Sequence, residues 1–234
     1  MNEEIIKVAP EVVKTTLPQL ANSVYQDLLS PAMKKAGQAL GNVIDFATLS
    51  FIPLEYVSAR IRMNIDKNLK NYQKKLDAVP ENEIRNVEPE IGVPIVEKLS
   101  YTTCEEIAEM YTTLLAKAST TATVNQAHPS FIQFLERMSV DEAKILKFLD
   151  GKVDFVCVRP KYYREENGGY IQIDGDITEL DDNVSLLFPQ NINSYIDNLC
   201  SIGVLMRKSG CYKIDEKLYE SVLKKGQSRI EAYK

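Results

Sequence analysis

The residues best suited by type and spacing to do chemistry are five carboxylates within nine positions. They are Asp174, Asp176, Glu179, Asp181 and Asp182. Clustered carboxylates supply the oxygen ligands that calcium and magnesium prefer. The calcium-loop pattern fails here, because Glu179 stands where glycine is required and Thr178 stands where Asp or Asn is required. We therefore predict a solvated acidic loop and no metal site.

Histidine chemistry is limited to one residue, His128, which makes most zinc sites improbable. Its neighbour Pro129 marks a helix start and no Ser or Cys nucleophile motif lies beside it, so we expect His128 to cap or pack at that start. The sequence has no phosphate-binding glycine loop, nucleophile elbow or catalytic carboxylate pair. We predict no catalytic residue, no cofactor and no small-molecule substrate, and hence not an enzyme.

The overall composition is that of a soluble globular protein that can bury a core. The chain has 234 residues, of which 44% are hydrophobic and 26% charged. Its net charge of -5 argues against a dedicated nucleic-acid binder. The acidic first residues are not a secretory n-region. The isolated cysteines, Cys104, Cys157, Cys200 and Cys211, are expected to be reduced thiols of a cytoplasmic protein.

The elements that would position any site begin with an apolar and then basic N-terminal region. Helical spacing is expected over 4–29 and 31–47, a third apolar run ends at Val57, and residues 60–75 form a basic amphipathic helix. No uncharged apolar stretch approaches the roughly 20 residues that a spanning helix needs. The region is nevertheless able to lie on an anionic membrane surface at the inner face of the membrane, or on a protein partner.

The contacts predicted for that membrane or partner surface fall into two groups. The apolar contacts are Phe46, Phe51, Ile52 and Leu54, and the basic contacts are Arg60, Arg62, Lys67, Lys70, Lys74 and Lys75. The alternative, which we favour for the resting protein, is that the helices bury their apolar stripes against each other and leave the basic face solvated. Gly37 and Gly41, four residues apart, permit close helix packing, either within the chain or against a second copy.

Residues 79–98 are predicted to be a linker, because Pro80, Pro89 and Pro94 recur among several glutamates. Helix starts follow at Thr102 or Thr103, at His128-Pro129, and at Ser139, where Glu142 completes a capping box. A hairpin is expected between about 153 and 174, around the turn Asn167-Gly168-Gly169.

The C-terminal tail predicts a winged-helix-like element. A helix from about 193 ends at Gly203, a short hairpin follows at 204–214, and a last helix begins at Asp215. A DNA-binding regulator is therefore the alternative function. The candidate recognition helix has no Lys or Arg, so nucleic acid is an unlikely partner, with Arg207, Lys208 and Lys213 as the nearest cations.

Four phrases of the sequence resemble a known family. They are Leu99-Ser-Tyr-Thr-Thr, Met110-Tyr-Thr-Thr-Leu-Leu-Ala, His128-Pro-Ser-Phe and Met138-Ser-Val-Asp-Glu-Ala-Lys-Ile-Leu. They are similar to the Abi-alpha group, a bacterial abortive-infection family formerly catalogued as a domain of unknown function. The resemblance spans roughly residues 35 to 215 and transfers no site residue. It implies antiphage defence by growth arrest or death of the infected cell.

Together these patterns predict a mainly helical protein with a C-terminal α+β, winged-helix-like region and short hairpins. The predicted division is an N-terminal helical region over 1–78, a linker over 79–98 and a domain over 99–234. The predicted function is non-catalytic abortive infection through protein or membrane-surface contacts, with protein partners or self-association.

Overall fold

The computed structural model describes residues 30–50, 59–152, 154–163, 168–172, 175–208, 210 and 213–231; the side chains of 44–50, 59–62 and 229 lie outside the description. The chain divides between Arg137 and Met138 into two compact units, here called the N-terminal and C-terminal units. The fold is mostly helical with one small two-stranded sheet, as the sequence predicts. Among the described helices, none is both long and apolar enough to cross a bilayer.

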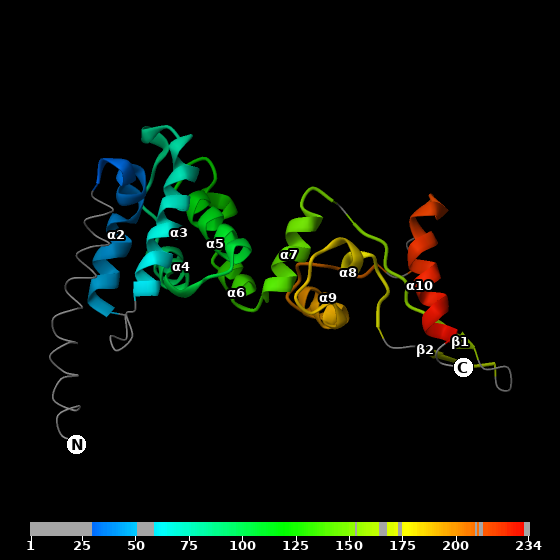
Figure 1. Ribbon diagram of the computed structural model, residues 1–234. Coiled ribbons are helices and arrows are strands. Elements are labelled where there is room, and N and C mark those ends of the chain that lie inside the picture. Colours follow the sequence, from blue (N-terminus) through cyan, green and yellow to red (C-terminus); the bar gives the residue numbers. More distant parts are fainter. Residues whose placement is uncertain are drawn as a thin grey trace, which may run out of the picture. The chain divides into compact units, whose positions relative to one another are not determined.

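The N-terminal unit is a helical bundle arranged around helix α3. Its helices are α2 (Lys34–Ser50), α3 (Ala59–Asp77), α4 (Pro89–Tyr101), α5 (Glu105–Ala118) and α6 (Ser130–Glu136), with 3-10 turns at Pro31–Met33, Glu81–Glu83 and Val124–Gln126. Helix α3 packs against α2, α4 and α5 (Figure 1).

The inner face of α3 supplies much of the core. Ile65, Leu69 and Leu76 are buried at helical spacing, so the predicted amphipathic helix is confirmed. Two buried amides on the same face tie α3 to its neighbours. The Asn68 side chain donates to the carbonyl of Leu99 at the end of α4 (2.8 Å), and the Gln73 side chain accepts from an amide at the start of α2 (2.9 Å). Such bonds offset the cost of burying the amides.

The second half of the segment predicted as a linker, 79–98, belongs to helix α4, and the structure divides the chain elsewhere. Ile91, Ile95 and Leu99 of α4 are buried in the core. Pro89 occupies the first helical turn, where its missing N–H costs nothing, so the proline starts this helix. Gly92 lets α4 approach α2 closely, because a Cβ there would lie 2.4 Å from the side chain of Val43.

The C-terminal unit contains short helices and a β-ribbon. Its elements are α7 (Val140–Leu149), β1 (Lys161–Tyr163), β2 (Tyr170–Gln172), α8 (Leu180–Asn183), α9 (Ile192–Ser201) and α10 (Glu220–Glu231), with 3-10 turns at Pro189–Asn191 and Glu216–Tyr219. The strands β1 and β2 pair antiparallel with Tyr163 opposite Tyr170, which confirms the hairpin predicted within 153–174.

The predicted capping box at the start of α7 is confirmed. The Ser139 hydroxyl accepts from the Glu142 amide (3.3 Å), and the Ser139 amide donates to the Glu142 carboxylate (2.6 Å). That carboxylate also accepts from the side chain of Asn198 on α9 (2.7 Å). The local cap therefore also joins two helices.

The wing predicted at 204–214 forms no strand in the residues described there. Gly203 adopts a left-handed conformation (φ 79°) and ends α9 as expected. The amides of Val204 and Leu205 then both donate back to the carbonyl of Leu199, at 3.0 and 3.1 Å. This closure of the helix uses the backbone groups that a wing strand would need. The predicted last helix is confirmed as a 3-10 turn followed by α10.

Replacing Gly92 by Ala should destabilise the N-terminal unit. The added methyl overlaps Val43, and overpacking of this kind costs about 1–3 kcal/mol. The matched control is Gly41→Ala on α2, where a Cβ meets nothing within 4 Å among the described residues. Since alanine favours a helix over glycine by about 1 kcal/mol, this control should be neutral or stabilising. Urea unfolding followed by circular dichroism measures both, and equal stability of Gly92→Ala and the unmodified protein would contradict the close approach.

Candidate functional site

Three of the basic residues predicted on α3 lie on the face opposite its core contacts. Lys67, Lys70 and Lys74 are exposed and follow Met63, whose side chain is 71% exposed, at spacings of four, three and four residues. Residues at this spacing share one side of a helix. We call Lys67, Lys70 and Lys74 the lysine stripe.

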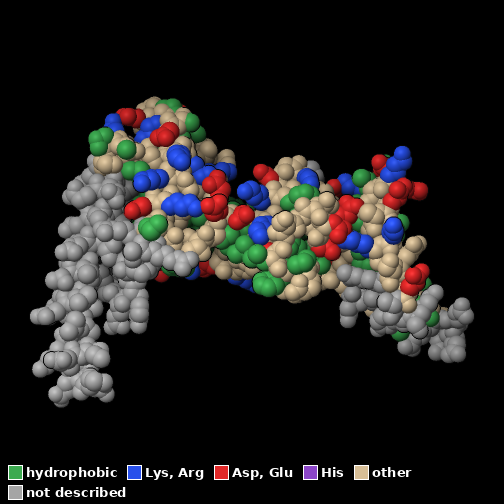
Figure 2. Space-filling view, viewed as in Figure 1, with side chains coloured by type: hydrophobic (Ala, Val, Ile, Leu, Met, Phe, Trp, Pro, Cys, Tyr) green, Lys and Arg blue, Asp and Glu red, His purple; other side chains and the backbone are tan. Residues whose placement is uncertain are grey.

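Acidic residues of α5 neutralise part of this basic surface. Lys67 pairs with Glu105 at 2.6 Å, and Lys75 pairs with Glu109. Lys70 and Lys74, by contrast, form no ion pair with any residue described, and they remain available to an external anion. Figure 2 shows basic and acidic side chains side by side over this unit. The pairing was invisible in the sequence because more than thirty residues separate the partners.

The other predicted contacts are only partly placed by the structure. Phe46 lies in α2, and Arg60 and Arg62 lie in α3, but their side chains are outside the description; Phe51, Ile52 and Leu54 lie outside the described residues. Gly41 is exposed, and Gly37 is half-buried beside it on α2. The role of these two glycines in contact with a second copy stays a prediction.

A buried carboxylate in the C-terminal unit fixes a loop whose side chains point outward. Asp141 is only 2% exposed, and its oxygens accept from the amides of Leu187 (2.8 Å) and Phe188 (2.9 Å) and from the hydroxyl of Tyr195 (2.9 Å). Leu187 and Phe188 are nevertheless 61% and 55% exposed. The fold thus holds in place the backbone that carries two exposed apolar side chains.

Those bonds also determine the acidity of Asp141. Burial alone would raise its pKa, but the two amides, the Tyr195 hydroxyl and the nearby Lys144 ammonium together lower the pKa below the ordinary value of 3.8. Asp141 is therefore ionised at neutral pH, and its oxygens accept hydrogen bonds that hold the fold together.

Carboxylates of the acidic segment 174–182 pair with different cationic residues. Asp176 is buried between Arg159 and Arg207, at 2.7 Å from each guanidinium, while Asp181 and Asp182 pair with Lys225 of α10. Asp174 lies outside the described residues. The predicted solvated loop is wrong for Asp176, because two arginines compensate its burial. Burial raises its pKa, and the arginines lower it further than burial raises it, so the net pKa lies below 3.8.

The Cys157 thiol is not activated as a nucleophile. Cys104, Cys157 and Cys200 are free thiols. Desolvation, followed by the charge of Asp176, raises the pKa of Cys157 to about 12, so this thiol is protonated at neutral pH and is a poor nucleophile. The His128 ring accepts from the Ser130 amide at the start of α6 (3.1 Å), which confirms its expected capping role.

The residues of the DNA-binding alternative are also placed. Arg207 contacts both Asp176 and Asp197 of α9, so its charge is shared with two carboxylates. Lys208 is exposed, and Lys213 pairs with Asp154. Binding to DNA stays a prediction of the sequence.

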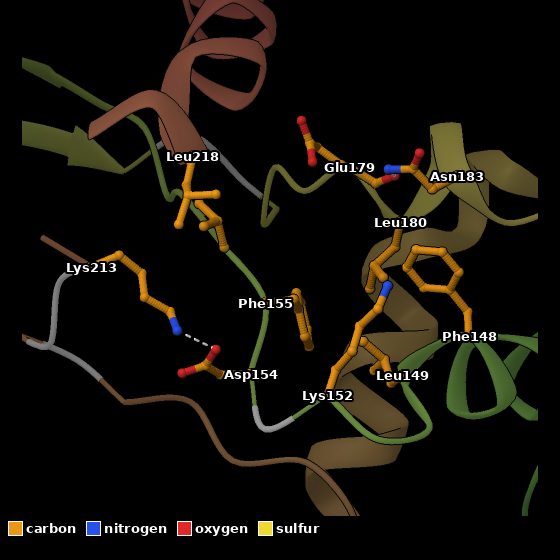
Figure 3. A pocket seen from close by; sticks show the side chains of 11 residues that line it. Phe148, Leu149, Lys152, Asp154, Phe155, Glu179, Leu180, Asn183, Lys213 and Leu218 are labelled. Atoms are coloured by element: carbon orange, nitrogen blue, oxygen red, sulfur yellow. Dashed lines mark hydrogen bonds and ion pairs between the residues drawn. The ribbon is translucent and has the colours of Figure 1, made fainter. Parts of the chain in front are cut away.

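A half-open pocket of about 400 Å³ lies wholly within the C-terminal unit. Its lining comes from the end of α7, the extended segment that follows, α8 and the turn before α10, with side chains shown in Figure 3. The lining residues are Phe148, Leu149, Lys152, Asp154, Phe155, Val156, Glu179, Leu180, Asn183, Lys213 and Leu218. Sequence patterns do not reveal this pocket, because it gathers residues up to 70 positions apart.

The comparison with protein families agrees with the resemblance found in the sequence. The family model described as abortive infection alpha matches residues 62–234, which is most of the chain. The chain belongs to the abortive infection alpha family. The match begins inside α3 and includes the lysine stripe, the anchored Leu187–Phe188 loop and the pocket of this family member. No curated protein and no solved structure matches the chain.

Replacing Asp141 by Asn should loosen the Leu187–Phe188 loop. The amide group keeps one acceptor oxygen but places a donor against the other backbone amide, which costs about 1–3 kcal/mol at pH 7. Hydrogen exchange at the Leu187 and Phe188 amides should accelerate, whereas Asp150→Asn, at an exposed position after α7, should leave it unchanged.

The pH dependence follows from the direction of the pKa shift. The folded-state pKa of Asp141 lies below 3.8, so its contribution to stability is present at neutral pH and is lost as the pH falls below about 4 toward that value. The Asp141→Asn protein should therefore lose less stability between pH 6 and pH 3 in urea unfolding. An unchanged pH profile would show that Asp141 does not stabilise the fold.

Proposed function

We propose that this family member arrests or kills phage-infected cells, and that it acts by binding through its surface rather than by catalysis. The family match over residues 62–234 supports the defence role. The observation that carries the surface mechanism is the outer face of α3, where Lys70 and Lys74 stand exposed and without an ion pair among the described residues.

An anionic membrane surface suits this face of α3. Each Lys near such a surface contributes about 1 kcal/mol, so the lysine stripe supplies about 3 kcal/mol at most. Glu105 competes for Lys67 and reduces that sum. Met63 at the end of the stripe adds an apolar contact. Binding of this strength is reversible and sensitive to salt, because exposed charges are screened over about 10 Å at 0.1 M ionic strength.

A protein partner suits the Leu187–Phe188 loop. A loop whose backbone is already ordered before binding loses less conformational entropy when its apolar side chains enter a partner's pocket. Asp141 provides that order through the two backbone amides. The proposed target of this loop is an apolar pocket on another protein, and its interaction should depend little on salt.

Neutralising Lys70 and Lys74 together should release the protein from anionic vesicles. Loss of about 2 kcal/mol corresponds to a partition coefficient about 30-fold lower for Lys70→Gln/Lys74→Gln. The control is Lys217→Gln/Lys224→Gln, which removes two exposed lysines of the C-terminal unit. Flotation with phosphatidylserine vesicles at low salt measures binding of the full chain. Failure of the unmodified protein to float, with or without phage infection, would contradict the membrane version.

The anchored loop is tested by Leu187→Ser/Phe188→Ser. Because both side chains are exposed, the variant should keep its melting temperature, yet it should lose protection of a bacterial culture against phage. Met206→Ser, at a side chain that is even more open to solvent, is the control and should keep protection. Full protection by the double variant would exclude the loop as the working contact.

A further inference from the structure

The pocket of the C-terminal unit has the size of a small-molecule site. Its volume of about 400 Å³ lies near the lower end of the range for ligand pockets, about 300–1,000 Å³. All its lining residues belong to one compact unit, so the site does not depend on how the two units are arranged.

The walls of the pocket are mainly apolar. Phe155 and Phe148 face the cavity with Leu180 between them and Leu218 across from them (Figure 3). Leu180 is buried, Phe148 and Phe155 are half-buried, and Leu218 is exposed. A ligand that covers these side chains removes apolar surface from water, which favours binding.

The charged groups of the pocket differ in whether they have an oppositely charged partner. Lys213 pairs with Asp154, which neutralises both charges, whereas Glu179 accepts from the neutral Ser221 hydroxyl and keeps its negative charge. Lys152 has no carboxylate partner among the residues described. Its ammonium instead lies over the Phe148 ring, 3.4 Å from the ring centroid.

The position of Lys152 favours an anion at the edge of the apolar wall. A ring face attracts a cation only weakly compared with a full negative charge, so the ammonium keeps most of its capacity to bind an anion. Lys152 is itself exposed, so an anion bound to its ammonium stays in contact with water, and the pair has the modest strength of a surface ion pair. A cationic ligand would be repelled at the same place.

We propose that this pocket binds a small amphipathic acid, with the acidic group on Lys152 and the apolar body against Phe155, Leu180 and Leu218. A cavity of about 400 Å³ suits an acyl chain of medium length or an aromatic body of two or three rings. This ligand site goes beyond the proposed surface contacts and is independent of the lysine stripe. It makes the C-terminal unit a receptor for a small anion.

The test uses two fluorescent probes of similar shape on the full chain. The anionic probe is 8-anilinonaphthalene-1-sulfonate, and the neutral one is N-phenyl-1-naphthylamine. We expect saturable binding of the anionic probe at one site, displaced by decanoate. Lys152→Gln should weaken the anionic probe about tenfold and leave the neutral probe unchanged, because only the charge is removed.

Two further variants locate the binding. Leu218→Asp, at an exposed position, should weaken both probes, whereas Lys147→Gln, an exposed lysine of α7 outside the pocket, should change neither. Melting temperature and near-ultraviolet circular dichroism show whether each variant is folded. No saturable binding by the unmodified protein, or identical affinities for the Lys152→Gln variant and the unmodified protein, would overturn the proposal. Vesicle flotation of Lys152→Gln should be normal, which separates this site from the membrane hypothesis.

Discussion

Helix α3 has one face in the apolar core and the opposite face in solvent. The packing of the N-terminal unit depends on this division. One face carries Ile65, Leu69 and Leu76 into the core between α2, α4 and α5. The opposite face is left to solvent and carries the lysine stripe. A helix with this division cannot turn about its axis without exposing apolar side chains and burying lysines, both of which cost free energy. The core therefore fixes the direction in which Lys70 and Lys74 point.

The C-terminal unit is held together in a different way. Its helices are short, and buried carboxylates, among them Asp141 and Asp176, organise the segments between them. Asp141 gathers backbone amides from the Leu187–Phe188 loop, and Asp176 joins Arg159 to Arg207. Each carboxylate is expensive to bury alone and stabilises the unit only while its partners remain in place. Such bonds have direction, so they define loop geometry more closely than apolar packing does.

Features that depend on neighbouring residues were predictable from the sequence. The Ser139–Glu142 capping box, the left-handed Gly203 and the amphipathic α3 all follow from side chains within one or two helical turns. The linker prediction over 79–98 failed because prolines and glutamates are equally compatible with a helix start, and only burial of Ile91 and Ile95 distinguishes the two cases. Three prolines in a short stretch indicated a break in secondary structure. In the structure, one of them, Pro89, is the first residue of helix α4.

The features that could not be predicted from the sequence depend on contacts between residues far apart in the chain. Glu105 and Glu109 reach α3 from another helix, so the net charge of the basic face is smaller than its sequence indicates. The pocket likewise brings Lys152 to Leu180 and Leu218 only through the fold. Neither the ion pairs of α3 nor the pocket corresponds to a motif or a periodic pattern in the sequence, because both depend on tertiary packing.

The two proposed contact surfaces, the lysine stripe and the Leu187–Phe188 loop, would act through different forces. Attraction by Lys70 and Lys74 extends over about one Debye length, weakens with salt and selects charge without selecting shape. The Leu187–Phe188 loop acts only on contact, is little affected by salt, and requires a complementary apolar pocket. Charge alone would hold the protein on any anionic surface of the cell, whereas the ordered apolar pair can distinguish one partner from another. If both surfaces are used, the stripe supplies local concentration and the loop supplies specificity, so a trigger needs to control only the partner of the loop.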